Sequence, residues 1–353
     1  MSKKENLYVD IHVLQTVPPS CVNRDDTGSP KIAVYGGATR ARVSSQSWKR
    51  AIRLAFGDMC NPGDLAVRTK KVKELLVNEI KEFAPEKAEK YAEKIMKDTG
   101  FKLDKKGDNA ALFFISHAQI KALTEIAQKL NEGDATEKDC KDECKSALRN
   151  TPGIDQVLFG RMVADDPSLN YDAAVQVAHA ISTHAVHNEY DYFTAVDDCA
   201  PDDNVGAAHI DTVEYNSATL YRYATVNVME LRKHLGDKAA EVARVFTEAF
   251  VTSMPTGKQN TFANRTLPDT VYVTVRKDQP VNLVGAFEKP VAGKQGYVDQ
   301  SVDALSKQAA AVYDDFVCKP EKAWCIGNVK EELGEKVTLK VMLDKLQEVL
   351  EEK

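Results

Sequence analysis

The sequence has no apolar run that approaches the roughly 20 residues needed to cross a membrane. This excludes a membrane-spanning helix, and the first residues, MSKKENLYVD, lack the apolar core of a secretion signal. Cysteine is also scarce. The chain has 7 cysteines, an odd number, and they are scattered along the sequence. That usage suits reduced thiols better than a disulfide framework, so we expect a cytoplasmic protein with no membrane partner.

Positive charge is in deficit over the chain as a whole. The 47 lysines and arginines are outnumbered by 53 acidic residues, which leaves a formal net charge of −6 at pH 7. This balance argues against unspecific binding of nucleic acid, but it does not exclude a local basic groove, because the field at a site depends on the nearest charges. The 353 residues, 43% of them hydrophobic, suffice for one large domain or two smaller ones.

Motifs of catalysis and of metal binding are also lacking. PTGKQNT (255–261) lacks the earlier glycine of a phosphate loop, which excludes an NTPase. A nucleophilic serine at 44 or 45 would need a general base, and the sequence places none. Cys140 and Cys144 have no nearby partner ligands, so we expect no metal and no cofactor. Three histidines in an apolar segment are better explained as packed or capping residues than as metal ligands: His179, His184 and His187.

Hydrophobic periodicity predicts an α+β protein. Alternating apolar residues predict strands at 7–14, 219–228 and 270–276, the first of them buried on one face only. Helical spacing of apolar residues from 58 to about 150 predicts a helical insertion. Other segments are predicted as follows: a loop at 16–30, a buried helix at 173–186, a polar acidic excursion at 195–216, and amphipathic helices at 241–254 and 337–353.

Positive charge gathers in one segment, GGATRARVSSQSWKRAIR (36–53), which has no acidic residue. The glycines suit a tight turn, ATRARV a short strand with Arg40 and Arg42 on one face, and Ser44 and Ser45 the start of a helix. A helix N-terminus with unpaired N–H groups attracts anions, so a row of donors beside it suits a phosphodiester backbone. The residues alone leave two interpretations open, a phosphate-binding surface and an ordinary solvated helix.

A second basic stripe lies on the helical insertion. Lys138, Lys141 and Lys145 are spaced three and four residues apart, which places them on one helix face. Acidic residues are interleaved with these lysines. A solvated helix face and a nucleic-acid contact therefore both remain open for this stripe.

Several segments together resemble a known family. VDIHVLQTVPPSCVNRDDTGSPKIAVYGG followed by TRARVSSQSWKRA, then FGRM (159–162), AHAISTHAVHNEYDYFTAVDD (178–198), TLYRYATVNV and PTGKQNTF (255–262) occur in order. In this arrangement the chain resembles the CasC family, the CRISPR RNA-binding backbone subunit of the type I-E CRISPR Cascade surveillance complex. The resemblance spans most of the chain and is weakest in the helical insertion and the C-terminal segment.

The resemblance implies a hand-shaped fold. The palm is a modified RRM-like, ferredoxin-like sheet, helical fingers are inserted into it, and a thumb protrudes from it. The implied boundaries are 1–57 for the first part of the palm, 58–150 for the fingers, 151–190 for the second part of the palm, 191–218 for the thumb, and 219–353 for the remaining palm and the C-terminal helix.

The resemblance also implies a function in antiviral defence. Several copies of the subunit form a filament along one CRISPR RNA, kink it at regular intervals and display it for pairing with the target DNA strand. The other implied partners are the large, small, guide-processing and 5′-handle-binding subunits of Cascade. Catalysis belongs to other proteins of the system, so we expect this chain not to be an enzyme.

Site residues are carried over by their place in the matching motifs. The implied contacts with the guide backbone are Arg24, Lys31, Ser44, Gln46, Lys49, Arg53, Lys258, Gln259 and Lys294. The implied wedge beside the kinked bases is Met162, next to Arg161, and the implied thumb residues are Phe193, Thr194, His209 and Ile210. The implied contacts with target DNA are Lys138, Lys141 and Lys145.

Two other functions compete with this interpretation. One is a metal-independent CRISPR repeat endoribonuclease on a related RRM-like fold, with His12 or His209 as general acid or base. The other is an acidic scaffold that binds no nucleic acid.

Overall fold

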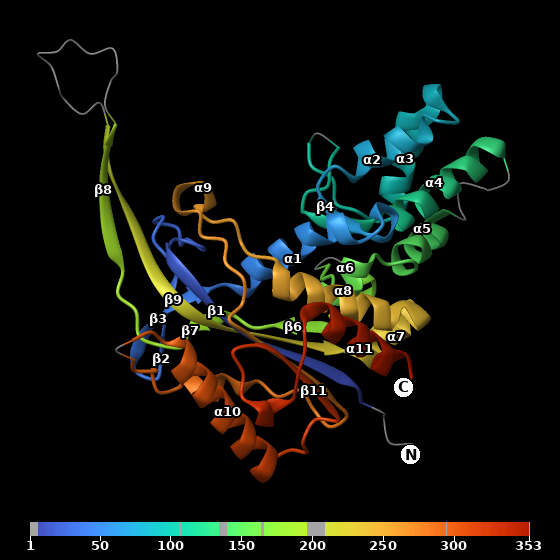
Figure 1. The fold of residues 1–353 in the computed structure, drawn as a ribbon. Helices are drawn as coiled ribbons and strands as arrows, with labels where there is room; N and C mark the ends of the chain where they lie inside the picture. Colours follow the sequence, from blue (N-terminus) through green and yellow to red (C-terminus); the bar gives the residue numbers. More distant parts are fainter. Residues whose placement is uncertain are drawn as a thin grey trace, which may run out of the picture. The chain divides into compact units, whose positions relative to one another are not determined.

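The chain forms two compact units (Figure 1). The computed structural model describes residues 6–105, 107–133, 140–163, 166–195, 209–293 and 295–352. Unit 1 is drawn from Met1–Ala55, Gln176–Met229 and Ala243–Lys353, and unit 2 from Phe56–Val175 and Glu230–Val242. Within the described ranges, no helix combines the length and the apolar character that a membrane span requires.

Unit 1 is built on a large, mostly antiparallel sheet. In the described residues its strands follow the order β12-β11-β10-β1-β9-β7-β3-β2, and β6 and β8 pair with β9 outside this path. The strands are β1 Tyr8–Ser20, β2 Ile32–Tyr35, β3 Ala38–Val43, β6 Val175–Val177, β7 Ala180–Ser182, β8 Glu189–Ala195, β9 His209–Asn227, β10 Thr270–Arg276, β11 Lys322–Gly327 and β12 Glu335–Lys336.

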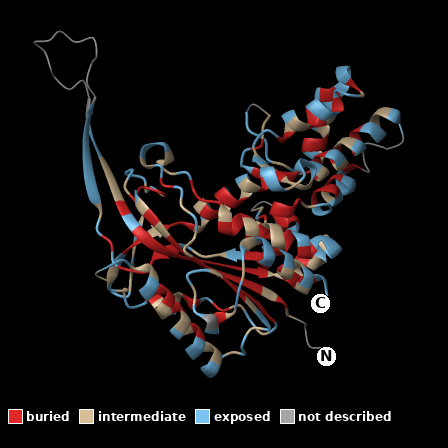
Figure 2. Cartoon of the chain, in the orientation of Figure 1, coloured by how far each residue is buried: buried red, intermediate tan, exposed pale blue. Residues whose placement is uncertain are grey.

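Strand β1 is buried on both faces, although its alternating sequence predicts a half-buried strand (Figure 2). Its polar face is covered too, because His12 lies in an aromatic cluster to which helix α10 (Val298–Asp315) contributes Leu305 and Ala309. On the opposite face, Arg222 of β9 lies under Trp48 of α1 (Ser45–Met59). Two helical layers thus enclose the strand, which also continues to Ser20, into the segment predicted as a loop.

The segment 173–186 corrects a sequence prediction. It was expected to be a buried helix, but it contains the short strands β6 and β7. Ile181 of β7 lies opposite Arg42 of β3 and Tyr221 of β9, so β7 joins the two strands into one sheet. Alanine-rich sequence favours a helix locally, but here the two neighbouring strands supply backbone partners that outweigh that preference.

Strand β9 extends beyond the sheet as a ribbon. Its outer residues pair with β8, from Glu189 opposite Tyr215 to Ala195 opposite His209. The described residues of β8 are exposed, as Figure 2 shows. The polar excursion predicted at 195–216 therefore begins and ends in a two-stranded ladder, which its composition alone did not indicate.

Helices flank the sheet of unit 1, and apart from the one expected at 173–186 the predicted ones are present. Trp48 and Ile52 of α1 are buried, as its apolar stripe predicts. The sequence also predicts the helices at 241–254 and 337–353 correctly. The remaining helices of this part are α8 Ala239–Thr252, α9 Gln259–Phe262, α10 Val298–Asp315 and α11 Leu339–Glu351, with short 3-10 helices η5 Leu283–Phe287 and η6 Glu331–Leu333.

Unit 2 is mainly helical and has its own core. Three of its helices, α2 Val72–Ile80, α3 Ala88–Asp98 and α4 His117–Glu132, confirm the helical periodicity of 70–130. A two-stranded sheet, β4 Ala66–Thr69 with β5 Phe113–Ser116, accompanies them. The unit extends to Val175 and takes in 230–242. Its other elements are α5 Cys140–Arg149, α6 Ile154–Phe159, α7 Val228–Leu235 and the 3-10 helices η1 Pro62–Asp64, η2 Pro85–Lys87, η3 Pro167–Leu169 and η4 Gly236–Lys238.

A buried histidine lies at the centre of the sheet of unit 1. His12 is 1% exposed, and its ring centroid lies 5.1 Å from that of Tyr223 and 5.4 Å from that of Tyr272. Its Nδ1 atom is 2.9 Å from the hydroxyl oxygen of Tyr221. Burial, helped by the positive charge of Arg276, lowers the pKa of His12 to about 3. The folded protein therefore holds His12 neutral at any pH near neutrality.

Replacement of His12 by phenylalanine should make unit 1 less sensitive to acid. In the unfolded chain His12 takes up a proton below its ordinary pKa of 6.5, whereas in the folded chain it stays neutral down to about pH 3. Stability is therefore lost as the pH falls below 6.5, by about 1.4 kcal/mol between pH 7.5 and 5.5. His12→Phe should abolish that part of the loss, at a cost of about 1 kcal/mol at pH 7.5 for the lost hydrogen bond.

The measurement is urea unfolding followed by tryptophan fluorescence. Both tryptophans, Trp48 and Trp324, lie in unit 1, so their emission reports on this unit alone. Equal acid sensitivity of His12→Phe and the unchanged protein would show that His12 is not held neutral by the fold.

Candidate nucleic-acid interface

A surface hollow in unit 1 brings together residues from two distant parts of the chain. It has a volume of about 440 Å³ and is lined by Arg24, Thr256, Lys258, Gln259, Asn260 and Thr261. Three of these residues, Arg24, Lys258 and Gln259, are implied guide contacts. Arg24 and Lys258 also lie close enough for both charges to act on the same thiol, that of Cys21. Two cations beside uncharged amide and hydroxyl groups suit an anionic ligand such as a phosphate.

Close backbone packing holds the two segments of this hollow together. A Cβ atom added at Gly257 would lie 2.1 Å from the carbonyl oxygen of Val22, so only glycine permits this approach. Asn264 Nδ2 donates a hydrogen bond to the Gly257 carbonyl at 3.3 Å. Lys258 then adopts a left-handed backbone conformation, with φ 50°. The loop that carries Lys258 is thus fixed against the loop that carries Arg24.

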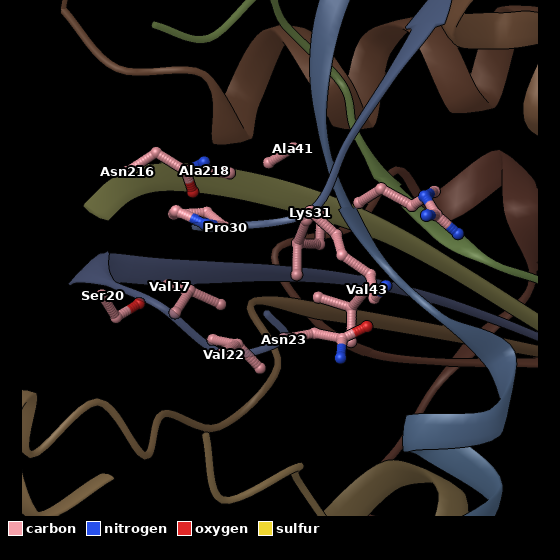
Figure 3. A pocket seen from close by; sticks show the side chains of 12 residues that line it. Val17, Ser20, Val22, Asn23, Pro30, Lys31, Ala41, Val43, Asn216 and Ala218 are labelled. Atoms are coloured by element: carbon pink, nitrogen blue, oxygen red, sulfur yellow. The ribbon is translucent and has the colours of Figure 1, made fainter. Parts of the chain in front are cut away.

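Asn23 connects this hollow to the basic segment. Its carbonyl oxygen accepts a hydrogen bond from the Lys31 N–H group at 2.8 Å, and its Oδ1 atom accepts one from the Ser44 N–H group at 2.8 Å. Asn23, Lys31 and Arg42 line a second, smaller pocket, together with residues of β1, β3 and β9 (Figure 3). Arg24, Lys31 and Ser44 are therefore held in one framework with Asn23 at its centre.

The start of helix α1 confirms the predicted cap but corrects the prediction of unpaired N–H groups. Ser44 precedes the helix, and its Oγ atom accepts a hydrogen bond from the Ser47 N–H group at 3.3 Å. The Ser45 N–H group donates to Nδ1 of His179 at 2.9 Å. Two of the first N–H groups thus already have acceptors within the protein. Binding of an anion here has to rest on outward side chains, which are the exposed Gln46 and the half-exposed Lys49 and Arg53.

Arg40 does not belong to the basic surface predicted for its segment. It is 0% exposed, and its guanidinium donates to the carbonyl oxygens of Ser182 and Phe287, both at 2.9 Å. Burial lowers its pKa. Arg42 is half exposed and donates through Nε to the Ile32 carbonyl oxygen at 3.3 Å. The two arginines therefore differ in role, and only Arg42 can face a ligand.

The family resemblance implies Arg161 as an RNA contact, but the structure buries its side chain. Arg161 is 4% exposed, and its guanidinium donates to the carbonyl oxygens of Leu169 at 2.9 Å and Leu148 at 2.8 Å. It also stacks on the ring of Tyr171, and burial lowers its pKa to about 10. Its place is in the interior of unit 2.

Met162 has the opposite environment. Its side chain is 87% exposed. The backbone on either side is fixed, because Arg161 and Tyr171 exchange two hydrogen bonds and the Val163 N–H group donates to Asn170 Oδ1. An apolar side chain presented to solvent on a fixed segment has the properties of a wedge.

The implied thumb residues lie on the β8–β9 ribbon. Phe193 faces the same side as Asp211 directly opposite, whereas Thr194, whose backbone pairs with that of Ile210, faces the other side. The side chains of His209 and Ile210 lie outside what the structure describes. Sequence reasoning missed Tyr190 and Tyr192, which are 68% and 62% exposed on one side of the ribbon, although the alternation in EYDYF was a signal for them.

The lysines of the second basic stripe have different surroundings. Lys141 is exposed, whereas Lys145 forms an ion pair with Asp166 at 3.1 Å. Lys138, like Lys294 of the implied guide contacts, lies outside the described residues. The structure therefore shows one outward lysine of this stripe.

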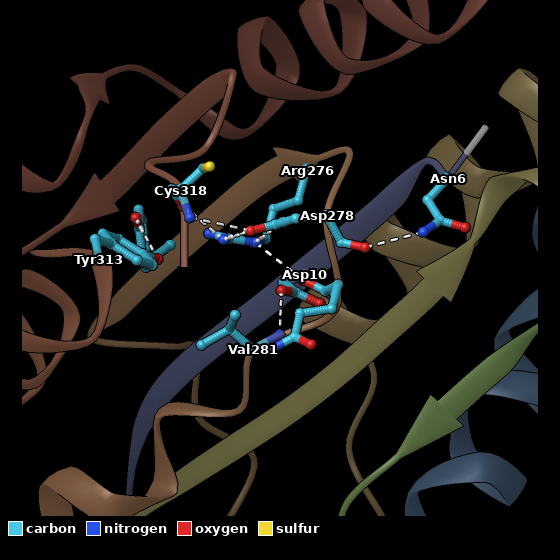
Figure 4. Close-up of polar contacts among 9 residues, drawn as sticks. Asn6, Asp10, Arg276, Asp278, Val281, Tyr313 and Cys318 are labelled. Carbon is cyan, nitrogen blue, oxygen red and sulfur yellow. Dashed lines mark hydrogen bonds and ion pairs between the residues drawn. The ribbon is translucent and has the colours of Figure 1, made fainter. Parts of the chain in front are cut away.

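The buried titratable groups of the sheet are closed to a large substrate. Asp10 accepts a hydrogen bond from the Tyr223 hydroxyl at 2.9 Å. It accepts another from the Val281 N–H group at 2.8 Å (Figure 4). Burial raises the pKa of Asp10 to about 6, against the opposing effect of these hydrogen bonds. Arg276 is held by Asp278 at 2.7 Å in the same region. Together with the enclosed His12, these groups stabilise the fold rather than meet RNA.

Metal ligands do not gather in the described part of the chain, where no group of three or more candidate side chains could hold an ion. His184 is packed, because its ring stacks on Tyr297 with centroids 3.6 Å apart and its Nε2 atom accepts from the Thr219 N–H group. His179 caps α1. For both, the expectation of packed or capping histidines is confirmed.

Comparison with known proteins identifies the family of the chain. The family model described as "CT1975-like protein" matches residues 9–352. The chain belongs to the CT1975-like family. Among curated proteins there is no significant match.

Solved structures agree with this CT1975-like assignment. A chain of a "CRISPR RNA-guided surveillance complex, pre-nicking" is 32% identical, with 97% of this chain and 100% of that chain covered and a TM-score of 0.85. A chain of a "CRISPR RNA-guided surveillance complex" is 28% identical, with 96% and 99% covered and a TM-score of 0.63. These findings confirm the resemblance to a Cascade backbone subunit and show a CRISPR-associated role.

Replacement of Gly257 by alanine should separate the two loops of the hollow. The added Cβ would collide with the Val22 backbone, and overpacking of this kind costs about 1–3 kcal/mol. Hydrogen exchange in peptides that cover 21–24 and 256–262 should become faster. Gly63→Ala is the matched control, because a Cβ there meets nothing within 4 Å. Equal exchange in both variants would contradict the proposed packing.

Replacement of Arg161 by methionine should destabilise unit 2, whereas Met162→Ala should not. Loss of the guanidinium leaves buried carbonyl oxygens without donors, at a cost of about 3 kcal/mol. Met162 is exposed, so its truncation should change stability by less than about 0.5 kcal/mol. Hydrogen exchange of α4 and α5 measures both effects. If protection in Arg161→Met is unchanged, Arg161 has no structural role in unit 2 and is again a candidate for RNA contact.

Proposed function

We propose that the chain is the non-catalytic backbone subunit of a type I-E Cascade complex, which binds CRISPR RNA and displays it for pairing with target DNA. The observation that carries this proposal is the meeting of Arg24 with Lys258 and Gln259 in one hollow. Three implied guide contacts from distant parts of the sequence thus lie together. The titles of the similar solved structures, which name RNA-guided surveillance complexes, support the same conclusion.

Local charge explains how an acidic chain holds an RNA backbone. The chain carries a net charge of −6, but the hollow and its surroundings present Arg24, Lys258, Lys31 and Arg42. Contacts with phosphates follow the backbone and carry no sequence information, so the subunit accepts any guide sequence. Base pairing with the guide then supplies the specificity for DNA.

Kinking of the guide is assigned to different side chains from backbone binding. The paired segments of the ribbon, EYDYFTA and HIDTVEY, contain no lysine or arginine. Such a ribbon is unsuited to follow phosphates, but Phe193 and Thr194 face opposite sides of it and suit insertion beside displaced bases, and Ile210 lies opposite Thr194 in the register. Met162, exposed on unit 2, serves as a second wedge.

The hand-like description follows from these assignments. The sheet of unit 1 corresponds to an RRM-like palm, the helices of unit 2 to the fingers and the β8–β9 ribbon to the thumb. Copies of the subunit assemble into a filament along one guide, and the outward Lys141 remains the candidate for contact with target DNA. The large, small, guide-processing and 5′-handle-binding subunits complete the set of partners.

The alternative of a repeat endoribonuclease loses one of its two catalytic candidates. His12 is enclosed by aromatic rings and held neutral, so RNA cannot reach it without unfolding of the sheet. His209 remains as a candidate on the ribbon. A general acid or base must come within hydrogen-bond distance of the scissile group, and the buried His12 cannot.

Loss of the two cations of the hollow should weaken RNA binding for every guide sequence. In the double variant Arg24→Gln, Lys258→Gln, about two phosphate contacts disappear, so the slope of log affinity against log salt should fall by roughly 2. Affinity should be titrated over a range of salt concentrations with single-stranded RNAs of several spacer sequences. Lys336→Gln, Lys340→Gln is the control, because it removes the same charge from exposed positions near the C-terminus.

Three outcomes would contradict the proposal. An unchanged salt slope would show that the hollow does not hold phosphates. A loss limited to some spacers would show that it reads bases. Cleavage of CRISPR repeat RNA that His209→Ala abolishes would favour the endoribonuclease.

A further inference from the structure

His179 lies next to the proposed RNA-binding surface, but it is not one of the implied guide contacts. It lies between β6 and β7, and its side chain is exposed. Its Nδ1 atom accepts the N–H group of Ser45, the first residue of α1, at 2.9 Å. One residue further along the helix is Gln46, an implied guide contact, and Lys49 and Arg53 follow on the same helix. An imidazole from another part of the chain thus holds the end of the helix that carries these residues.

This hydrogen bond fixes the chemical form of the imidazole. A nitrogen that accepts a hydrogen bond cannot carry a proton, so Nδ1 is unprotonated and the ring proton is on Nε2. Protonation of His179 would convert Nδ1 into a donor that faces another donor, the Ser45 N–H group. The cap therefore exists only while His179 is neutral.

The surroundings of His179 favour the neutral form. Partial burial lowers the pKa of His179, and the positive charge of Arg42 on β3 lowers it further. From α1 the ring meets the Ser45 N–H group, which does not titrate. Because the pKa of His179 in the folded chain lies below the ordinary value of 6.5, the cap is complete at pH 6.5 and above, and it is lost only as the pH falls through that lower pKa.

We propose that His179 is a positioning residue of the RNA-binding surface, which in its neutral form holds the first turn of α1 in the geometry that binds the guide backbone. The inference rests on the proposed function for its effect on RNA, but the cap itself exists without RNA. Loss of an N-cap hydrogen bond frays the first turn of a helix. The guide contacts that follow on α1 then lose their fixed positions.

The direction of the pH effect distinguishes this role from a direct contact. A histidine that touched phosphate would bind RNA more tightly when protonated, because it would add positive charge. A histidine that caps α1 weakens the surface when protonated. Acid should therefore lower the RNA affinity of the unchanged protein relative to a variant whose cap does not titrate.

Two substitutions provide a matched pair. In His179→Asn the side-chain oxygen can take the place of Nδ1, so the cap is kept and no longer titrates. In His179→Gln the longer side chain places its amide near the position of Nε2, so a direct contact would be kept and the cap lost. His179 is exposed, so both variants should fold, which tryptophan fluorescence of unit 1 verifies.

The experiment measures the affinity of the full chain for a labelled single-stranded RNA of mixed sequence at a series of pH values from 7.5 down to 4.5. At pH 7.5 we expect His179→Asn to match the unchanged protein and His179→Gln to bind roughly three- to fivefold more weakly, the size expected for one capping hydrogen bond. As the pH is lowered through the pKa of His179, the unchanged protein should weaken relative to His179→Asn. Normal binding by His179→Gln, or tighter binding of the unchanged protein in acid relative to His179→Asn, would overturn the inference.

Hydrogen exchange of the Ser45 amide gives a test that needs no RNA. Exchange should be faster in His179→Gln than in the unchanged protein and His179→Asn. If RNA binding is absent in all three proteins while this difference is present, the proposed function fails and the cap stands. If the Ser45 amide exchanges equally in all three, the inference fails whatever the RNA affinity.

Discussion

Strand β9 pairs with different strands along its length, and both the core and the ribbon depend on this. Its inner residues pair with β1 in the middle of the sheet, and its outer residues pair with β8. Because the backbone is continuous, the sheet sets the direction in which the ribbon leaves it. The inner part of β9 is buried between two helical layers, whereas the ribbon is exposed to solvent and therefore tolerates polar residues. One strand thus serves the stability of the fold and the presentation of side chains to a ligand.

The arginines of the chain fall into two groups with different physical roles. Arg40, Arg161 and Arg222 are buried, and each donates to backbone carbonyl oxygens. Arg24 is exposed beside Lys258. Carbonyl oxygens accept hydrogen bonds from a guanidinium without neutralising its charge, so each of these residues links segments that are distant in the sequence. The number of positive charges along the sequence does not distinguish the buried arginines from the exposed ones.

Much of the fold could be predicted because its signals are local. The helices at 70–83, 85–98 and 115–130 follow from apolar spacing within single segments, and the strand at 270–276 from its alternation. The segment 173–186 was mispredicted because its strands are short and depend on partners in β3 and β9. The ribbon was missed for the same reason, since each of its strands is polar and only their pairing makes them a ladder. The roles of individual residues toward RNA came from the family resemblance and not from periodicity.

The sequence by itself determined that α1 starts after Ser44 and buries the stripe with Trp48 and Ile52, since a cap and an apolar period act within one segment. Only the tertiary structure decided which basic residues reach solvent and which meet. Arg40 and Arg42 stand two residues apart, yet one is enclosed because carbonyl groups from other segments surround it. Arg24 and Lys258 are far apart in the chain and line one hollow, because Gly257 allows the backbone of its loop to approach Val22.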